Sequence, residues 1–180
     1  KNIILLAWPM MVLGVLYALN LLLEMIWVGR LGPESIAGIG VAGMIVTLVI
    51  AIKSGFGLGE RAMIARFIGE KNPAMANHTG AQALLISIAY AALVALVGLL
   101  FARPILSLFG LTGGAINEGV HYLRIVLAGW VTEAIWITSF SVMQASGDTL
   151  TPMKIAVVIR VVNAALCPFM VLGWWVFPRL

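Results

Sequence analysis

Long apolar runs separated by short glycine- and proline-containing turns dominate this chain. A helix that crosses a membrane needs about 20 mostly apolar residues. The runs that meet this length cover residues 3–28, 34–67, 75–101, 116–145 and 152–177. Backbone groups in lipid must be satisfied within the segment, so each run is expected to be a helix. Short turns make neighbouring helices antiparallel, which predicts an all-α integral membrane protein built as an antiparallel transmembrane bundle.

Composition supports this prediction and narrows the functions. The chain is 62% hydrophobic and 10% charged, whereas soluble domains carry about 25% charged residues. The net charge is +4, but the basic residues are scattered along the chain and form no basic patch. We therefore do not expect nucleic acid as a partner, and we do expect membrane lipid. A single cysteine allows no internal disulfide and no thiolate metal cluster. No nucleophile–base pair or cofactor loop is present, so we expect neither an enzyme nor a cofactor.

Glu24 is the charge that the first apolar run carries near its end. Carboxylates inside membrane helices are costly and usually functional. Tyr17, Asn20 and Glu24 are spaced i, i+3 and i+7, so they lie on one helix face. We expect this face to turn away from lipid and to bind a proton or a cation. The alternative is that Glu24 reaches the membrane interface or neutralises Arg30.

Glu133 and the glycines of the second apolar run each have two interpretations. Glu133, midway along 116–145, could face a substrate cavity and attract cations, or it could pair with Lys53 or Arg160. The glycines Gly55, Gly57 and Gly59 indicate either close helix packing or a flexible bend. The turn at 147–152 contains a possible N-cap in Thr151, a proline suited to the first helical position and Asp148, which would cap or fix the turn.

The charges of the loops suggest how the chain is oriented in the membrane, and the chain ends suggest that it is a fragment. With the N-terminus in the cytoplasm, the inner side collects five basic residues and the outer side four. The inner set is Lys1, Arg61, Arg66, Lys71 and Lys154; the outer set is Arg30, Arg103, Arg124 and Arg179. The chain begins with Lys1 and ends just after an apolar stretch, so we expect it to be part of a longer protein.

Several short motifs, taken in order, resemble one family of transporters. They are LAWPM at 6–10, EMIWVGRLG at 24–32, IARFIG at 64–69, GAQAL at 80–84 and QASGDTLTPM at 144–153. This set resembles the N-terminal lobe of multidrug and toxic compound extrusion (MATE) transporters. The loop Gly147, Asp148, Thr149, Leu150, Thr151, Pro152 is its most specific piece.

The resemblance implies a fold and a function. Members have twelve transmembrane helices in two six-helix lobes, with the N-terminus in the cytoplasm. They export cationic or amphipathic compounds in exchange for protons or sodium ions. The present chain would supply helices one to five, and the sixth helix and the C-terminal lobe would be missing partners from the same polypeptide. The expected location is the plasma or inner membrane of the cell.

The resemblance also implies a coupling site on helices one and five. The family carries an aspartate where Glu24 stands. On helix five it commonly has Asn-x-x-x-Asp-Pro, which here reads Asn163 to Pro168 with Cys167 in place of the aspartate. The resemblance thus implies Glu24 and Asn163, and the helix face adds Asn20 and Tyr17 to the candidate coupling site. Without the second carboxylate, we expect H⁺ rather than Na⁺ as the coupling ion.

Two other functions stay open at this stage. A lipid-linked oligosaccharide flippase of the same superfamily would share the fold, but it would be expected to have a more cationic central cavity. A non-transporting membrane scaffold or remnant would explain the lost helix-five aspartate and the short length.

Overall fold

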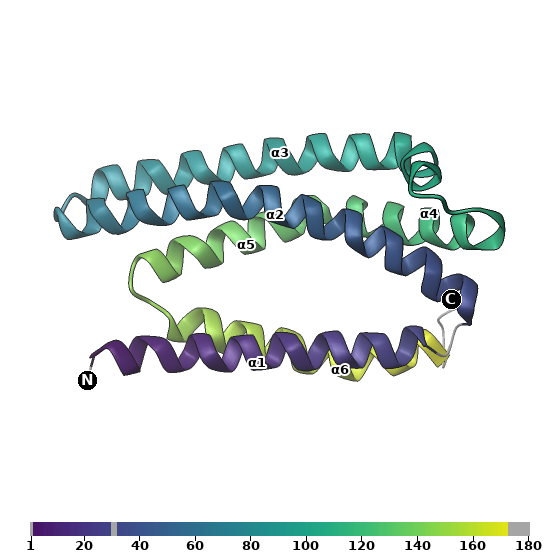
Figure 1. The fold of residues 1–180 in the computed structure, drawn as a ribbon. Coiled ribbons are helices and arrows are strands. Elements are labelled where there is room, and N and C mark those ends of the chain that lie inside the picture. The colour runs from purple at the N-terminus through teal and green to yellow at the C-terminus, as the bar shows by residue number, and fades with distance from the viewer. Residues whose placement is uncertain (1, 30–31, 173–180) are drawn as a thin grey trace. The chain divides into compact units, whose positions relative to one another are not determined.

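The computed structural model describes residues 2–29 and 32–172. These residues form the helices α1 (Asn2–Val28), α2 (Pro33–Gly69), α3 (Pro73–Leu108), α4 (Gly113–Ala128), α5 (Trp130–Ala145) and α6 (Leu150–Leu172), with no strand among them (Figure 1). The expected all-α class is confirmed. The chain divides into two compact units, one holding α1 and α6 and the other holding α2 to α5.

A tight turn joins α2 to α3 and makes them antiparallel neighbours (Figure 1). Lys71 takes a left-handed conformation with φ of 54°. The side chain of Asn72 then accepts a hydrogen bond from the backbone N–H of Met75 at 3.1 Å. Pro73 follows at the start of α3, where its missing N–H costs nothing. This Asn-Pro pair therefore fixes the point at which α3 begins.

The segment expected as one helix over 116–145 is two helices in the structure. Residues 113–145 are broken at Gly129, where α4 and α5 meet at a bend of 49°. Glycine is among the weakest helix formers, which makes this position the natural place for a break. Trp130, directly after it, is buried in the apolar core. The third helix is also longer than expected, since it continues through Pro104 to Leu108.

Small residues allow the helices of the α2–α5 unit to approach closely. α2 packs against α3, α4 and α5, and α3 packs against α4 and α5. At Gly38 a Cβ atom would collide with the backbone carbonyl oxygen of Ala115 on α4. The apolar core combines alanines of α2, α3 and α5 with larger side chains such as Leu106, Leu123 and Trp130. Small-against-large packing of this kind is typical of membrane helix pairs.

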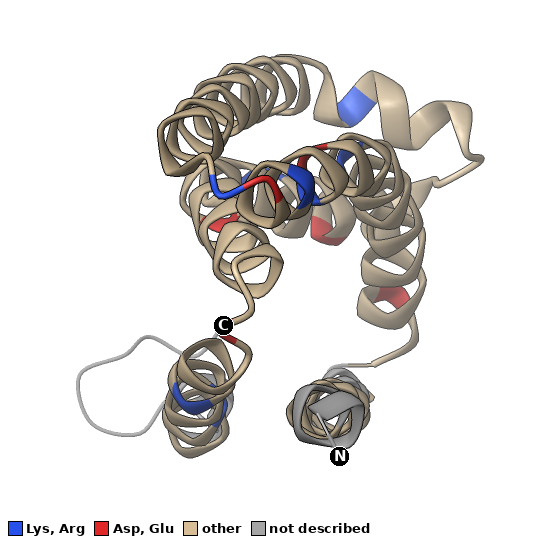
Figure 2. Ribbon diagram, turned by 90° about the vertical axis from the view of Figure 1, so that its left-hand side faces the viewer, with Lys and Arg blue, Asp and Glu red and all other residues tan. Residues whose placement is uncertain are grey.

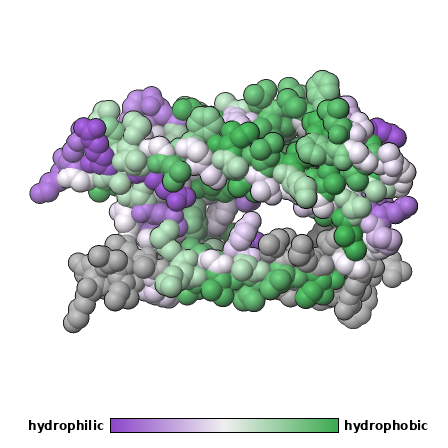
Figure 3. Space-filling model, in the orientation of Figure 1, coloured by the Kyte–Doolittle hydropathy of each residue, from purple (hydrophilic) through white to green (hydrophobic). Residues whose placement is uncertain are grey.

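The outer surface of this unit is apolar over most of its length. Leu85, Met44 and Leu108 are among many large hydrophobic side chains left exposed. Figure 3 shows hydrophobic residues covering most of the visible face of α2 and α3, with hydrophilic ones gathered where α2 turns into α3. Charged residues are sparse along the ribbon (Figure 2). Such a surface suits lipid and not water.

Helix length and composition agree with a membrane location. In the described residues, α2 and α3 are each long and apolar enough to cross a membrane, and the bent α4–α5 pair passes the same test as one broken span. In the other unit α1 packs against α6. The fold is therefore an all-helical membrane bundle, as the apolar runs predicted.

Candidate functional site

One residue of the polar face predicted on α1, Tyr17, contacts α6 in the structure. Asn20 is buried, while Tyr17 is largely exposed. The guanidinium carbon of Arg160, on α6, lies 5.5 Å from the centroid of the Tyr17 ring. A cation placed over an aromatic face at this distance is attracted by the ring electrons. Arg160 therefore joins the predicted α1 face, where sequence reasoning had treated it as a partner for Glu133 or as an interfacial charge.

Asn163 belongs to the same part of α6. It lies three residues after Arg160, so the two side chains are neighbours along the helix. The side chain of Asn163 is exposed. The side chains of Glu24 and Cys167 lie outside the described residues, although their backbones continue α1 and α6. The structure thus brings Tyr17 to Arg160 and leaves the predicted role of Glu24 a prediction.

The turn before α6 is organised by Asp148. Its Oδ1 accepts a hydrogen bond from the backbone N–H of Thr151 at 3.0 Å. This bond holds the pKa of the Asp148 carboxyl below its usual range, with help from the Thr151 side chain and the charge of Lys154. Gly147 supplies the left-handed conformation with φ of 90°. Thr149 and Pro152 are buried.

The structure decides between two sequence expectations for the cap of α6. Thr151 was a possible N-cap with Pro152 as the first helical residue, and Asp148 was expected to cap or fix the turn. The helix begins at Leu150, and Asp148 supplies the oxygen that caps a backbone N–H. A carboxylate is both a strong acceptor and favoured by the helix dipole, which explains why it takes this role.

The α2–α5 unit contains a buried ion pair that sequence reasoning did not identify. Lys53 Nζ lies 3.8 Å from Glu60 Oε2, and the two side chains are only 4% and 8% exposed. Lys53 Nζ and Glu60 Oε1 make no hydrogen bond to the described part of the chain. Lys53 therefore pairs with Glu60 and not with Glu133, which is exposed. The sequence could have indicated this pair, because Lys53 and Glu60 carry opposite charges and are spaced i, i+7 on one helix.

Two pairs of polar side chains in this unit form hydrogen bonds between helices, while buried Trp130 Nε1 makes none within the described residues. Arg61 donates from Nε to Ser141 Oγ at 2.7 Å and so links α2 to α5. Thr138 donates to Ser87 Oγ at 2.9 Å and links α5 to α3. Interhelical bonds between small polar side chains are common in membrane bundles. Unlike these two pairs, the Lys53–Glu60 pair is incompletely satisfied.

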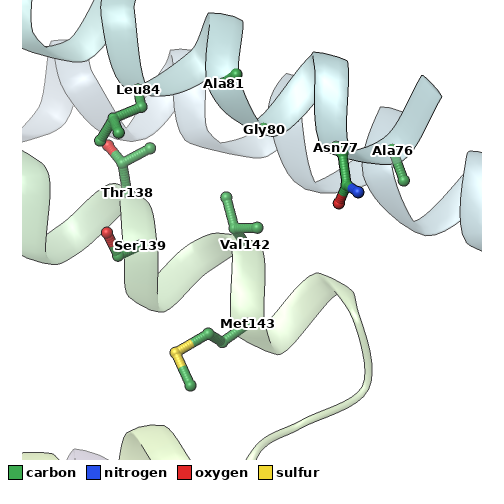
Figure 4. Close-up of a pocket in the computed structure, with 9 residues that line it drawn as sticks. All are labelled: Ala76, Asn77, Gly80, Ala81, Leu84, Thr138, Ser139, Val142 and Met143. Carbon is green, nitrogen blue, oxygen red and sulfur yellow. The ribbon is translucent and has the colours of Figure 1, made fainter. Parts of the chain in front are cut away.

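A cavity of about 350 Å³ opens between α3 and α5. It is lined by Ala76, Asn77, Gly80, Ala81, Leu84, Thr138, Ser139, Val142 and Met143 (Figure 4). In Figure 4 the Asn77 and Val142 side chains point into the space between the two helices. The lining has no charged residue, and Glu133 is not part of it. This cavity therefore lacks the carboxylate that would attract a cation.

Comparison with known proteins identifies the family of the chain. The model of the family described as MatE matches residues 9–169, which is most of the chain. The chain belongs to the MatE, or MATE, family. This confirms the resemblance drawn from the sequence motifs. A transporter family also supports the expectation that the protein is not an enzyme.

Relatives of this MATE chain are longer transporters. It is 27% identical to the "Probable multidrug resistance protein YoeA" of Bacillus subtilis (strain 168), over 96% of this chain and 37% of that protein. It is 25% identical to the "FAD transporter" of Shewanella oneidensis, over 88% of this chain and 35% of that protein. The MATE chain thus spans less than two fifths of the length of these relatives.

Solved MATE structures share its fold. A structure described as "Crystal structure of MATE in complex with MaD3S" matches with a TM-score of 0.91 and 27% identity, over 96% of this chain and 39% of that one. A transporter from Pyrococcus furiosus, described as having a binding pocket of reverse polarity, matches with a TM-score of 0.89 and 28% identity, over 97% and 39%. The membrane bundle is therefore the MATE fold.

Proposed function

We propose that this chain is part of a secondary active exporter of cationic or amphipathic small molecules. The observation that carries the proposal is the family match over residues 9–169. Relatives described as multidrug resistance proteins add to it. Transport by alternating access needs two opposed halves, so the activity would belong to a longer protein with a sixth helix and a second lobe.

The proposed ion-coupling site is the polar face of α1 with the facing part of α6. Tyr17 and Asn20 lie one turn apart on α1, and Glu24 follows Asn20 by four residues on the same face. Asn163 lies beside Arg160, which contacts Tyr17. Glu24 would take up the ion while the neighbouring amides and phenol supply hydrogen bonds. Polar groups gathered in apolar helices support this role.

We favour H⁺ over Na⁺ as the coupling ion. A proton needs one acceptor atom, and Glu24 supplies it. A sodium ion needs several oxygen ligands at once, and Cys167 stands where a second carboxylate would help. Protonation of Glu24 and binding of a cationic substrate would then compete, which gives an exchange mechanism. We also propose the plasma or inner membrane as the location, with lipid around the apolar helices and the N-terminus in the cytoplasm, which the apolar surface and the loop charges support.

The test is Glu24→Gln in the complete natural protein. We expect dye efflux from proteoliposomes to be lost under an imposed proton gradient while expression and folding are retained. A sodium gradient of the same size should drive little efflux in either protein. Glu118→Gln is the matched control, because Glu118 is an exposed carboxylate on α4. Full efflux by the Glu24 variant would overturn the proposed coupling role.

Arg160 favours a second candidate function, export of an anionic aromatic compound. A guanidinium beside a phenol ring is a suitable site for a phosphate or a flat ring. One relative is described as an FAD transporter. Arg160→Gln should abolish uptake of flavin nucleotide into inverted vesicles under this candidate and leave export of a cationic dye intact. Loss of dye export alone would favour the first function.

A further inference from the structure

Three glycines weaken the middle of α2. Gly55, Gly57 and Gly59 lie within an otherwise continuous helix. A Cβ atom at Gly55 or Gly59 would meet nothing within 4 Å, and one at Gly57 would meet only Glu60 Oε1 at 3.9 Å. Close packing inside the described part of the chain therefore does not require these glycines. Of the two interpretations that the sequence left open, the structure favours a flexible bend.

The same stretch of α2 has little apolar packing. Residues from Val41 to Ile50 pack on the apolar core, and the next buried apolar residue on the helix is Ile64. Between them Phe56 and Leu58 are 55% and 71% exposed. Segments with few buried apolar contacts open more easily than their surroundings.

One hydrogen bond inside the helix adds to this weakness. Ser54 Oγ donates to the carbonyl oxygen of Ile50 at 2.9 Å. A serine that bonds back to the preceding turn competes with the backbone N–H for that carbonyl, and such bonds often accompany helix bends. Thr47 makes the same kind of bond to the Gly43 carbonyl at 2.8 Å, so the Ser54 bond matters only together with the three glycines that follow it.

The buried ion pair joins the two ends of this weak stretch. Lys53 precedes the glycines, Glu60 follows them, and their side chains meet on one face at 3.8 Å. Bending the helix away from the face that carries the pair would separate the charges. Separation inside an apolar bundle leaves each charge unpaired, which is strongly unfavourable unless water reaches it. The pair therefore favours a straight, dry α2, and hydration of both charges favours a bent one.

We propose that residues 53–60 of α2 form a hinge that the Lys53–Glu60 ion pair holds straight. The hinge bends when water reaches the two side chains. The part of α2 before residue 53 stays packed on the apolar core, while the part after residue 60 moves together with the residues that it contacts, such as Ser141 of α5. Its use in alternating access rests on the proposed export function, but the bending itself does not.

Amide hydrogen exchange in the complete protein tests the hinge without any substrate. Backbone amides of 54–60 should exchange at least about tenfold faster than those of 40–50 on the same helix. Replacing Gly55, Gly57 and Gly59 with alanine should slow exchange of 54–60 by about fivefold per substitution, because alanine stabilises a helix relative to glycine. Gly40→Ala is the control and should leave the exchange of 54–60 unchanged. A Cβ at Gly40 also meets nothing within 4 Å, so the two kinds of substitution are alike in packing. Equal exchange of the two segments would overturn the proposal.

Charge variants test the ion pair. Glu60→Gln should speed exchange of 54–60 severalfold, because it leaves the Lys53 charge buried and unpaired. The double variant Lys53→Met, Glu60→Met should return exchange of 54–60 close to the wild-type rate, since neither residue then leaves a buried charge unpaired. Exchange in the double variant as fast as in Glu60→Gln would contradict the proposal. If the single variant does not fold, the glycine series still decides, because those substitutions stabilise the helix.

The two proposals can fail separately. Fast exchange of 54–60 in a protein that exports no dye would retain the hinge and reject the export function. Uniform exchange along α2 in a protein that exports dye would reject the hinge alone. In an active exporter, the triple alanine variant should lower the efflux rate severalfold while Gly40→Ala leaves it unchanged.

Discussion

Arg160 on α6 lies over the ring of Tyr17 on α1, with 5.5 Å between the guanidinium carbon and the ring centroid. The two residues are far apart in the sequence, and their contact joins α1 to α6. It places a positive charge on the helix face that carries the predicted coupling residues. Any ion or substrate bound at that face would be influenced by this charge.

The Tyr17–Arg160 contact should stabilise the packing of α1 on α6. Cation–π pairs contribute about 0.5–1 kcal/mol at exposed sites and about 2 kcal/mol when desolvated. We expect Tyr17→Leu and Arg160→Gln to show a coupling free energy in that range in a double-mutant cycle measured by thermal unfolding in detergent. Pairing Tyr17→Leu with Lys154→Gln, another α6 cation, should give none. Purely additive effects of the first pair would argue against the contact.

The Lys53–Glu60 pair should show strong non-additivity. Removing either partner leaves a buried charge unpaired and should lower the free energy of unfolding by about 3 kcal/mol. Replacing both with methionine should restore most of that loss, because an apolar pair of similar size needs no hydration. Denaturant titration in micelles would measure this. A double variant as unstable as the sum of the singles would show that the two residues do not interact.

Gly38 and Gly40 should respond oppositely to alanine. At Gly38 a Cβ collides with the backbone carbonyl of Ala115 and approaches the Gly119 nitrogen at 2.8 Å. Backbone atoms cannot move aside cheaply, so Gly38→Ala should destabilise by about 1–3 kcal/mol. Gly40→Ala, in open space two residues later, should be neutral or stabilising by up to about 1 kcal/mol. Equal melting temperatures for the two variants would contradict the close approach of α2 and α4.

The Asp148 turn should lose stability in acid. The Thr151 N–H lowers the folded pKa of Asp148, so its contribution is fully present above the unfolded pKa, near 3.8, and is lost as pH falls through the folded value. Carbon NMR of the Asp148 carboxyl should show a titration midpoint below that of an unstructured aspartate. The difference in thermal stability between wild type and Asp148→Ala should be small and should vanish below the folded pKa. A midpoint at the ordinary value would show that the hydrogen bond does not persist in solution.

The helices α1, α2, α3 and α6 could be placed from the sequence because apolar runs and their turn residues are local signals. The turn residues Asn72 and Pro73 mark the start of α3 directly. The break at Gly129 was not foreseen, because 116–145 is apolar on both sides and the bend depends on how Trp130 enters the core. The sequence offered both Asp148 and Thr151 as capping residues of the last turn, and only backbone geometry chooses between them.

For the candidate site too, some features could be read from the sequence and others required the structure. The spacing of Tyr17, Asn20 and Glu24 is a property of one helix and can be read from the sequence. The approach of Arg160 to Tyr17 joins residues of two helices. The burial of Lys53 with Glu60 likewise depends on which face α2 turns toward its neighbours.

The sequence by itself determined that this chain is a helical membrane protein and, through its motifs, that it belongs to the MATE family. Helix length and apolar content depend on neighbouring residues alone, so no tertiary contact is needed to recognise them. Only the tertiary structure decided which polar residues meet, since burial and pairing depend on helix rotation and packing. It added Arg160 to the predicted face and showed a buried ion pair across the glycines of α2.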